Sequence, residues 1–358
     1  MSRDARRSGF TGGLRNHTPL VLVAAVLAVA GALAGLQLFV ARQAFVVISE
    51  ERMLRIPNDD YVHVSFRVAD LKKHPPTTPV VYLFGGSGTL ELLHSEGALA
   101  DAVSAAAGTP VEVVDLATHD QSPGQTLAII DNLPSTPGLL AIGVSPNRLT
   151  ASPQHDAGQL GGKPLALTSP RLAEVLAGRV DTGPRLPGLL PGILDFAVSY
   201  VRSRASLSTP WLSSVTRADH YYVDGEAASM SARIAGSREE LAREKRLYDT
   251  YAAYNLDVLR EAIRLGRERG FTVALFEQPL APEASGPAWE AFLARYRSSI
   301  RELAREEGVP YVDVQPRARL SADDFVDFFH LKGSGRDKWT EVFAPSLAEA
   351  LAAGQPTV

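Results

Sequence analysis

The hydrophobic pattern of the chain changes character along its length. Residues 18–41 contain no charged side chain, and residues 19–40 are almost wholly apolar. At 1.5 Å per residue, a helix over this run is long enough to cross a hydrocarbon core of about 30 Å. From residue 79 onward, short apolar runs alternate with longer amphipathic segments. The pattern predicts an apolar N-terminal helix followed by strands that alternate with helices.

The C-terminal part of the pattern predicts five strands and five main helices. The expected strands are residues 80–84, 110–116, 139–144, 271–276 and 309–314, and the expected helices are residues 90–107, 125–133, 238–269, 289–307 and 338–352. Short, continuously apolar strands separated by helices are typical of a parallel sheet that is covered on both faces. We therefore expect a three-layer α/β/α domain with a five-stranded, flavodoxin-like parallel sheet.

Two regions depart from this rhythm and define the expected domain boundaries. Residues 42–78 are predicted to be a juxtamembrane segment and linker, with one half-exposed strand at 61–68 and the linker proper at 72–76. Residues 149–237 are predicted to be a mainly helical insertion, whose apolar stretch at 186–201 is too short to span a bilayer. The α/β domain is expected to cover residues 79–352.

Charges around the apolar N-terminal run predict its orientation. Residues 1–18 carry four arginines and one acid, so the positive-inside rule places them in the cytoplasm and the rest of the chain outside. A cleaved signal peptide with a small-residue site at Ala32-Leu33-Ala34 is the alternative. Because the apolar run continues to Val40, beyond that site, we expect a retained single-pass anchor over residues 19–41.

Composition narrows the classes of function. Hydrophobic residues make up 45% of the chain and charged residues 21%, as expected for a globular domain with a real core. The formal net charge of −4 leaves no basic surplus for a nucleic-acid partner. The chain has no cysteine, which excludes a thiol nucleophile and disulfides. The histidines other than His330 form no pair at metal-ligand spacing on one helix, so no metal site is expected. We expect no other cofactor.

Candidate catalytic groups follow the predicted strands, at the edge where parallel sheets collect functional residues. Ser87 follows the first strand within a glycine-flanked turn, Gly124 lies beyond the second, and Asn147 lies beyond the third. Asp327 and His330 come after the fifth strand. Acyl transfer needs a nucleophile, a base and donors for the oxyanion, and this set supplies all of them.

This order of parts resembles the SGNH (GDSL-type) hydrolase superfamily over roughly residues 79–148 and 240–350. The resemblance implies that Ser87 is the nucleophile, His330 its base and Asp327 the carboxylate that orients the base. It also implies an oxyanion hole formed by the Ser87 N–H, the Gly124 N–H and the Asn147 side chain. Asp-x-x-His followed by a glycine-containing turn and a helix is the most specific match.

Three features differ from the usual family pattern. Gly86 stands where the family has an aspartate before the nucleophile, the Gly-x-Asn-Asp block is stretched to Gly143-x-x-x-Asn147, and the insertion of about 90 residues is long. Membrane-anchored relatives with such insertions look like proteins that acylate or deacylate cell-envelope polysaccharides. The resemblance thus implies an acylated glycan or small acyl ester as substrate, and a membrane-bound acyl-transfer partner fits the same context.

Several alternatives remain open at this level. The Gly-Gly-Ser-Gly segment is also compatible with a structural turn, and His330 with a loop or helix cap. Residues 84–89 are similar to the glycine-rich loop of adenine-type methyltransferases, but the chain lacks their base-holding motif. The sequence does not distinguish an esterase from an O-acyltransferase. A non-catalytic envelope scaffold or glycan-binding protein is the alternative from another class.

Overall fold

Five parallel strands form the centre of the structure. The computed structural model describes residues 19–162, 167, 169–180, 189–206, 213–218, 220, 230–281 and 287–353. The strands are β1 (Val80–Phe84), β2 (Glu112–Asp115), β3 (Gly138–Val144), β4 (Thr272–Glu277) and β5 (Tyr311–Val312). They form one sheet in the order β2-β1-β3-β4-β5, and every neighbouring pair is parallel. The expectation of an α/β domain with a five-stranded parallel sheet is confirmed.

Helices occupy most of the remaining described chain. The N-terminal and pre-sheet helices are α2 (Pro19–Ala41), η1 (Ala44–Val47), α3 (Glu50–Met53) and α4 (Asp60–Lys73). Those between β1 and β4 are α5 (Ser87–Leu90), α6 (Glu96–Ala107), α7 (Pro123–Asn132), η2 (Pro146–Thr150), α8 (Pro153–Gly162), α9 (Pro170–Leu176), α10 (Leu189–Ser206) and α11 (Met230–Glu268). Those after β4 are α12 (Pro287–Glu307), α13 (Gln315–Ala318), η5 (Ala322–Asp324) and α14 (Gly333–Ala353).

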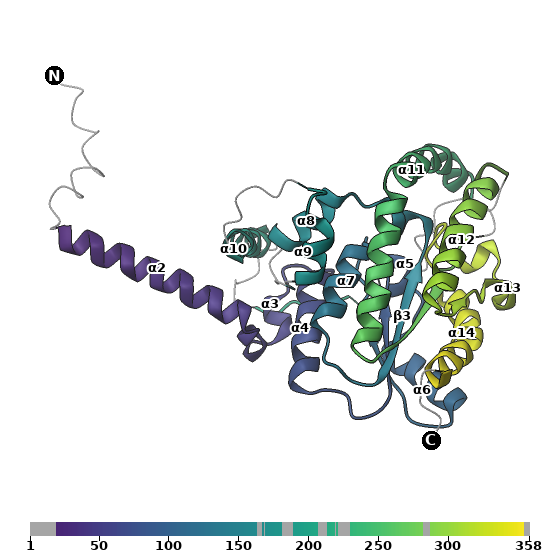
Figure 1. The fold of residues 1–358 in the computed structure, drawn as a ribbon, viewed down its shortest axis with the longest axis horizontal. Helices are drawn as coiled ribbons and strands as arrows, with labels where there is room; N and C mark the ends of the chain where they lie inside the picture. The colour runs from purple at the N-terminus through teal and green to yellow at the C-terminus, as the bar shows by residue number, and fades with distance from the viewer. Residues whose placement is uncertain are drawn as a thin grey trace.

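The sheet lies in the interior because its central strands have no polar face. Every residue of β1 and β3 is buried, as expected for strands that read as continuous apolar runs. Helix α6 packs against α14, and helix α7 packs against α11 (Figure 1). Because all five strands run in the same direction, the segments that follow them leave the sheet at one edge.

Residues 61–68 are helical, so the prediction of a strand there is wrong. They belong to α4, whose N-cap Asp59 accepts a hydrogen bond from the Val62 N–H. The helix is buried on two sides: Val62, Phe66 and Ala69 join one apolar cluster. The remaining apolar side chains, Val64, Val68 and Leu71, join the main core. Coverage on two sides places apolar residues at every second position, which imitates the period of a strand.

Other element boundaries also differ from the predictions. The helix expected at 90–107 begins only at Glu96, as α6, where Ser95 caps it by accepting from the Ala98 N–H. Leu90, its first expected residue, is the last residue of the separate short helix α5. The expected linker at 72–76 begins inside α4, which ends at Lys73. Strand β5 is only two residues long. In the expected insertion, the described residues form α8, α9, α10 and the beginning of α11, and its other residues lie outside the described part.

Helix α2 extends away from the α/β domain (Figure 1). Its segment Pro19–Leu36 has a mean hydropathy of 2.5 and is not buried inside the structure. Within the described chain, α2 is the helix that is long and apolar enough to cross a membrane. Residues 1–18, whose charges predict the orientation, lie outside the described residues.

We predict opposite effects for alanine at two helical glycines. On Gly266 of α11 a Cβ would lie 2.7 Å from Leu140 Cδ1 and 3.0 Å from Val273 Cγ2, whereas on Gly158 of α8 it would meet nothing within 4 Å. Gly266→Ala should lower the free energy of unfolding by about 1–3 kcal/mol through overpacking of helix on sheet. Gly158→Ala should raise it by up to about 1 kcal/mol, because alanine favours the helix. Urea unfolding measures both, and equal effects would contradict the close contact of α11 with the sheet.

Candidate active site

A cleft of about 690 Å³ lies at the edge where the strands end. Its lining includes Ser87 from the turn after β1, Ser122 from the segment after β2, and Asn147 from η2 after β3. Gln278 comes from the end of β4, and His330 from the loop that precedes α14. The cleft thus collects side chains from segments that are far apart in the sequence.

The turn that carries Ser87 requires glycine at position 85, because it leaves no space there for a side chain. A Cβ on Gly85 would lie 1.9 Å from Thr89 Oγ1, and the Gly85 N–H donates to Gln121 Oε1 at 3.0 Å. The first backbone bonds of α5 run from the Thr89 and Leu90 N–H groups to the Gly86 carbonyl. Ser87 therefore lies at the beginning of a helical turn that follows directly from a buried strand, and its side chain is half-buried at the cleft.

Ser87, His330 and Asp327 form a continuous chain of hydrogen bonds. His330 Nε2 lies 2.9 Å from Ser87 Oγ, and His330 Nδ1 lies 2.6 Å from Asp327 Oδ2. An ionised carboxylate only accepts hydrogen bonds, so Nδ1 carries the proton and Nε2 accepts from the Ser87 hydroxyl. Burial raises the pKa of Asp327, but hydrogen bonds from the His330 ring and from the Phe329 and His330 N–H groups outweigh it and lower the pKa overall. Asp327 is thus held ionised beside the imidazole.

The loop of Asp327 and His330 is fixed by backbone and side-chain bonds. Asp327 Oδ1 accepts from the Phe329 and His330 N–H groups at 2.8 and 3.0 Å, and Phe325 pairs with Leu331 in an isolated antiparallel bridge. Asp324, three residues before Asp327, is 2% exposed. Burial raises the pKa of Asp324, but hydrogen bonds, with Lys338 first, outweigh it and lower the value to about 2. The ion pair between the buried Asp324 and the partly exposed Lys338 fastens this loop to α14.

The structure places the two further oxyanion candidates differently. Asn147 lines the cleft, and its Oδ1 accepts from Ser145 Oγ at 2.5 Å, which orients the amide. Gly124 lies in the first turn of α7 and is not among the described residues that line the cleft. A Cβ on Gly124 would lie 2.4 Å from the carboxyl carbon of Asp156, which is fully buried. The structure thus brings Asn147 to the same cleft as Ser87, and Gly124 to a buried carboxyl group.

Arg148 is a cleft residue that sequence reasoning did not single out. It is 5% exposed, and its guanidinium donates to the Gln121, Ser122 and Gly143 carbonyls and to Thr126 Oγ1. Burial lowers its pKa to about 10. These bonds join the segment after β2 to the end of β3, so Arg148 holds together two walls of the cleft. Its position directly after Asn147, a candidate for the oxyanion hole, was the signal in the sequence that could have pointed to Arg148.

The two residues at the end of β4 have separate environments. Gln278 lines the cleft, and its Nε2 donates to Thr89 Oγ1 at 2.6 Å beside the serine turn. Glu277 is buried away from it and accepts from Tyr296, Arg297 and Tyr311. Burial raises the pKa of Glu277 above its ordinary value despite these bonds. Of this pair, only Gln278 lines the cleft that contains Ser87 and His330.

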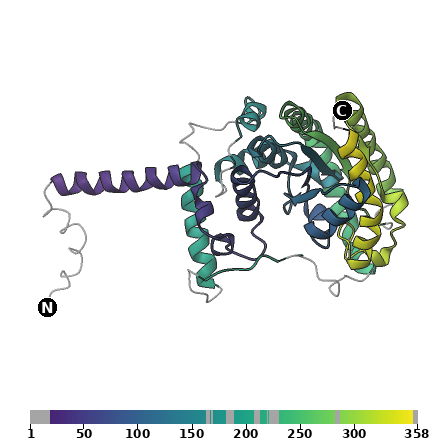
Figure 2. The ribbon, with the colours of Figure 1, turned by 90° about the horizontal axis from the view of Figure 1, so that it is seen from below.

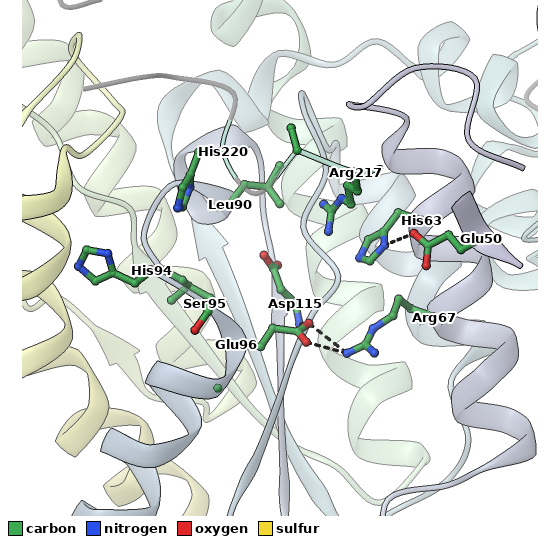
Figure 3. A pocket seen from close by; sticks show the side chains of 13 residues that line it. Glu50, His63, Arg67, Leu90, His94, Ser95, Glu96, Asp115, Arg217 and His220 are labelled. Atoms are coloured by element: carbon green, nitrogen blue, oxygen red, sulfur yellow. Dashed lines mark hydrogen bonds and ion pairs between the residues drawn. The ribbon is translucent and has the colours of Figure 1, made fainter. Parts of the chain in front are cut away.

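A second polar cavity, of about 510 Å³, lies beside α4 and the end of β2 (Figure 3). It contains two charged or polar pairs: Glu50 with His63 Nδ1 at 2.6 Å, and Arg67 with Glu96 at 2.8 Å. The carboxyl group of Asp115 points into this cavity (Figure 3). Residues 119–122, which follow β2, line the cleft with Ser87 instead.

Asp115 has a strongly perturbed carboxyl group. Burial is the main cause and raises its pKa to about 7, with a smaller contribution from the nearby Glu96 carboxylate. A hydrogen bond from the Ala117 N–H to Asp115 Oδ1 acts in the opposite direction. Between about pH 4 and 7 the folded protein therefore holds a proton that the unfolded chain has lost. The contribution of Asp115 to stability must fall as the pH rises through this window.

We predict that Asp115→Asn makes the protein less sensitive to alkaline conditions. The side chain of the variant has no proton to lose. The free energy of unfolding of the variant minus that of the wild type should therefore be larger at pH 8 than at pH 5, by about 1 kcal/mol or more. Urea titrations at both pH values measure the difference. Asp101→Asn, an exposed substitution on α6, is the matched control. A difference between Asp115→Asn and wild type that does not change with pH would contradict the raised pKa.

Comparison with known proteins does not assign this geometry to a family. No protein-family model matches the chain, and no curated protein matches it.

Proposed function

We propose that the chain is an SGNH-type serine esterase or O-acyltransferase that acts on acyl esters of a cell-envelope polysaccharide or a related glycan. The observation that carries the proposal is the hydrogen-bond chain from Asp327 through His330 to Ser87, at the edge of a parallel sheet. A serine bonded to a histidine that a carboxylate orients is the signature of nucleophilic acyl transfer.

The first half of the reaction would form an acyl-enzyme. His330 Nε2 takes the proton of the Ser87 hydroxyl while Ser87 Oγ attacks the ester carbonyl carbon. The tetrahedral intermediate then breaks the bond to the alcohol oxygen, and the alcohol leaves with the proton from His330. Asp327 keeps the imidazole in the tautomer that accepts this proton and stabilises the imidazolium that forms.

The second half would transfer the acyl group to an acceptor. Water or a sugar hydroxyl gives its proton to His330 and attacks the acyl carbon, and Ser87 Oγ recovers the proton as it leaves. Water as acceptor yields a carboxylic acid, and a sugar hydroxyl yields a new ester. Which acceptor is used depends on how well the cleft excludes water and holds a glycan.

The oxyanion would be stabilised at the beginning of α5. The first backbone hydrogen bonds of that turn are donated by the Thr89 and Leu90 N–H groups, and the Ser87 N–H lies before them at the start of the helix. The Asn147 amide lies in the same cleft. Each such donor acts on the charge that develops in the transition state. The third expected donor is the Gly124 N–H. Gly124 lies two residues after Ser122, which is the last residue of this segment that lines the cleft. We therefore assign the larger share of the oxyanion stabilisation to the Ser87 N–H and the Asn147 amide.

The proposed architecture and location follow from the same features. The strand order and the packing of α6 on α14 and α7 on α11 are compatible with a three-layer, flavodoxin-like α/β/α domain. Helix α2 would be a retained single-pass anchor with a cytoplasmic N-terminus, so that the cleft faces the extracytoplasmic side. A membrane-bound acyl-transfer protein is a partner that fits this location.

We predict that a fluorophosphonate probe labels the wild-type protein at Ser87. The probe needs a serine activated by a base, so Ser87→Ala and His330→Ala should each abolish labelling while the circular dichroism spectrum is unchanged. Ser152→Ala is the matched control, because Ser152 lines the same cleft and its hydroxyl accepts from the His155 N–H instead of bonding His330. This control should retain full labelling.

The outcomes separate the two classes of function. Labelling that both active-site substitutions remove supports the enzyme. Labelling that survives Ser87→Ala would overturn the assigned nucleophile. A folded wild-type protein that resists the probe would favour a non-catalytic envelope scaffold or glycan-binding protein.

We predict a smaller loss for Asp327→Asn than for either other substitution. The amide can still accept from the Phe329 and His330 N–H groups, but its NH₂ or carbonyl no longer fixes the imidazole as a carboxylate does. The rate of labelling should fall by roughly two to four orders of magnitude, with residual reactivity above that of His330→Ala. A time course of labelling measures this, and a rate equal to wild type would exclude Asp327 from the catalytic chain.

A further inference from the structure

The large hydrophobic side chains that are exposed in the described chain are concentrated in one region. Apart from those of α2, they belong to two segments, residues 47–56 and 198–201. They are Val47, Ile48, Ile56, Val198 and Val201, of which Val47 is 77%, Val198 56% and Val201 62% exposed. Scattered exposed apolar residues need no explanation, but a concentration in one place marks an interaction surface.

Both segments lie at the C-terminal end of α2. Residues 47 and 48 follow it directly in the chain, and helix α10 contacts it. Figure 1 shows α10 nearly end-on beside the end of α2, and after the quarter turn to Figure 2 the same helix runs across the end of α2. Helix α10 is therefore oriented crosswise to the apolar helix near the C-terminal end of α2.

The two sides of α10 differ in what they contact. Tyr200 donates to the Arg52 carbonyl at 3.0 Å, and Arg204 donates to the Leu54 carbonyl at 2.7 Å, so this side packs on α3 and the residue after it. At 100° per residue, Val198 and Ala205 point about 100° or more away from both Tyr200 and Arg204, and Val201 lies between these two directions on the flank of the helix. All three are exposed, so the apolar side of α10 faces away from the α/β domain.

The end of α2 is also fastened to the domain. Phe39 packs against the apolar cluster that includes Phe45, Leu54 and Phe66, and the Phe45 and Phe66 rings lie 5.1 Å apart. Arg204 of α10 bonds the carbonyl of Leu54, a member of the same cluster. One cluster thus holds both helices, so a bilayer crossed by α2 would begin next to the exposed side of α10.

We propose that the exposed side of α10, together with Val47 and Ile48, binds the surface of the bilayer that α2 crosses. The inference rests on the proposal that α2 is a membrane anchor, and it is independent of the catalytic assignment. A helix that lies flat in the headgroup region presents an apolar side to the acyl chains. Arg202 lies on the same side and can extend its guanidinium to the headgroups. This second contact fixes the orientation of the cleft relative to the membrane.

Spin labelling of the full chain in nanodiscs tests the proposal. The chain has no cysteine, so each single cysteine variant carries one label. Labels replace Val198 and Val201 on α10, Val29 in the middle of α2, and the exposed Ala106 on α6 as the aqueous control. The measurement is the accessibility of each label to oxygen, which concentrates in the bilayer, relative to a water-soluble nickel chelate.

The expected oxygen-to-nickel ratio at positions 198 and 201 is roughly threefold or more above that at position 106, and below that at position 29. If position 29 is in the bilayer but positions 198 and 201 match position 106, the anchor stands and the surface contact is refuted. If position 29 is also aqueous, the anchoring proposal itself fails. Protection of positions 198 and 201 from both reagents would indicate a protein partner on this surface and overturn the lipid assignment.

Discussion

The hydrogen bond between His330 Nε2 and Ser87 Oγ joins residues that are 243 positions apart in the chain. A distance of 2.9 Å over such a separation requires rigid support at both ends. The serine follows β1, whose residues are all buried and which is paired with β2 and β3. The histidine loop is fixed by its antiparallel bridge and by the ion pair of Asp324 with Lys338. Most of the described structure can be understood as support for these two positions.

The cleft walls are held by buried polar groups, which cost energy unless every bond is satisfied. Arg148 is buried with carbonyl and hydroxyl acceptors, so its charge is stabilised by oriented dipoles. Asp156 accepts from Ser122 Oγ and Tyr254 OH at 2.6 and 2.7 Å beside the start of α7. Such bonds are directional, and they fix the loops after β2 and β3 more closely than apolar packing does.

The errors in the predicted elements have a common physical cause. In α4, burial on two sides produced an alternating pattern that a local reading assigns to a strand. At Ser95 a side-chain cap begins a helix that composition alone starts at residue 90. In both cases the deciding contact comes from outside the window in which periodicity is read. The strands β1 and β3 were predictable because they are buried throughout and read as continuous apolar runs, and β4 because its interior residues Val273–Phe276 do so.

The sequence by itself determined the apolar N-terminal helix, the alternation of strands and helices, and the candidates Ser87, Asp327 and His330, because these depend on local composition and short spacings. Only the tertiary structure decided which candidates meet. It placed Asn147 in the cleft with Ser87, placed Gly124 against the buried Asp156, and added Arg148 and Gln278 to the cleft walls. It also placed the exposed side of α10 at the end of α2. Such placements depend on the order and register of the strands and on packing between distant segments, which local sequence does not encode.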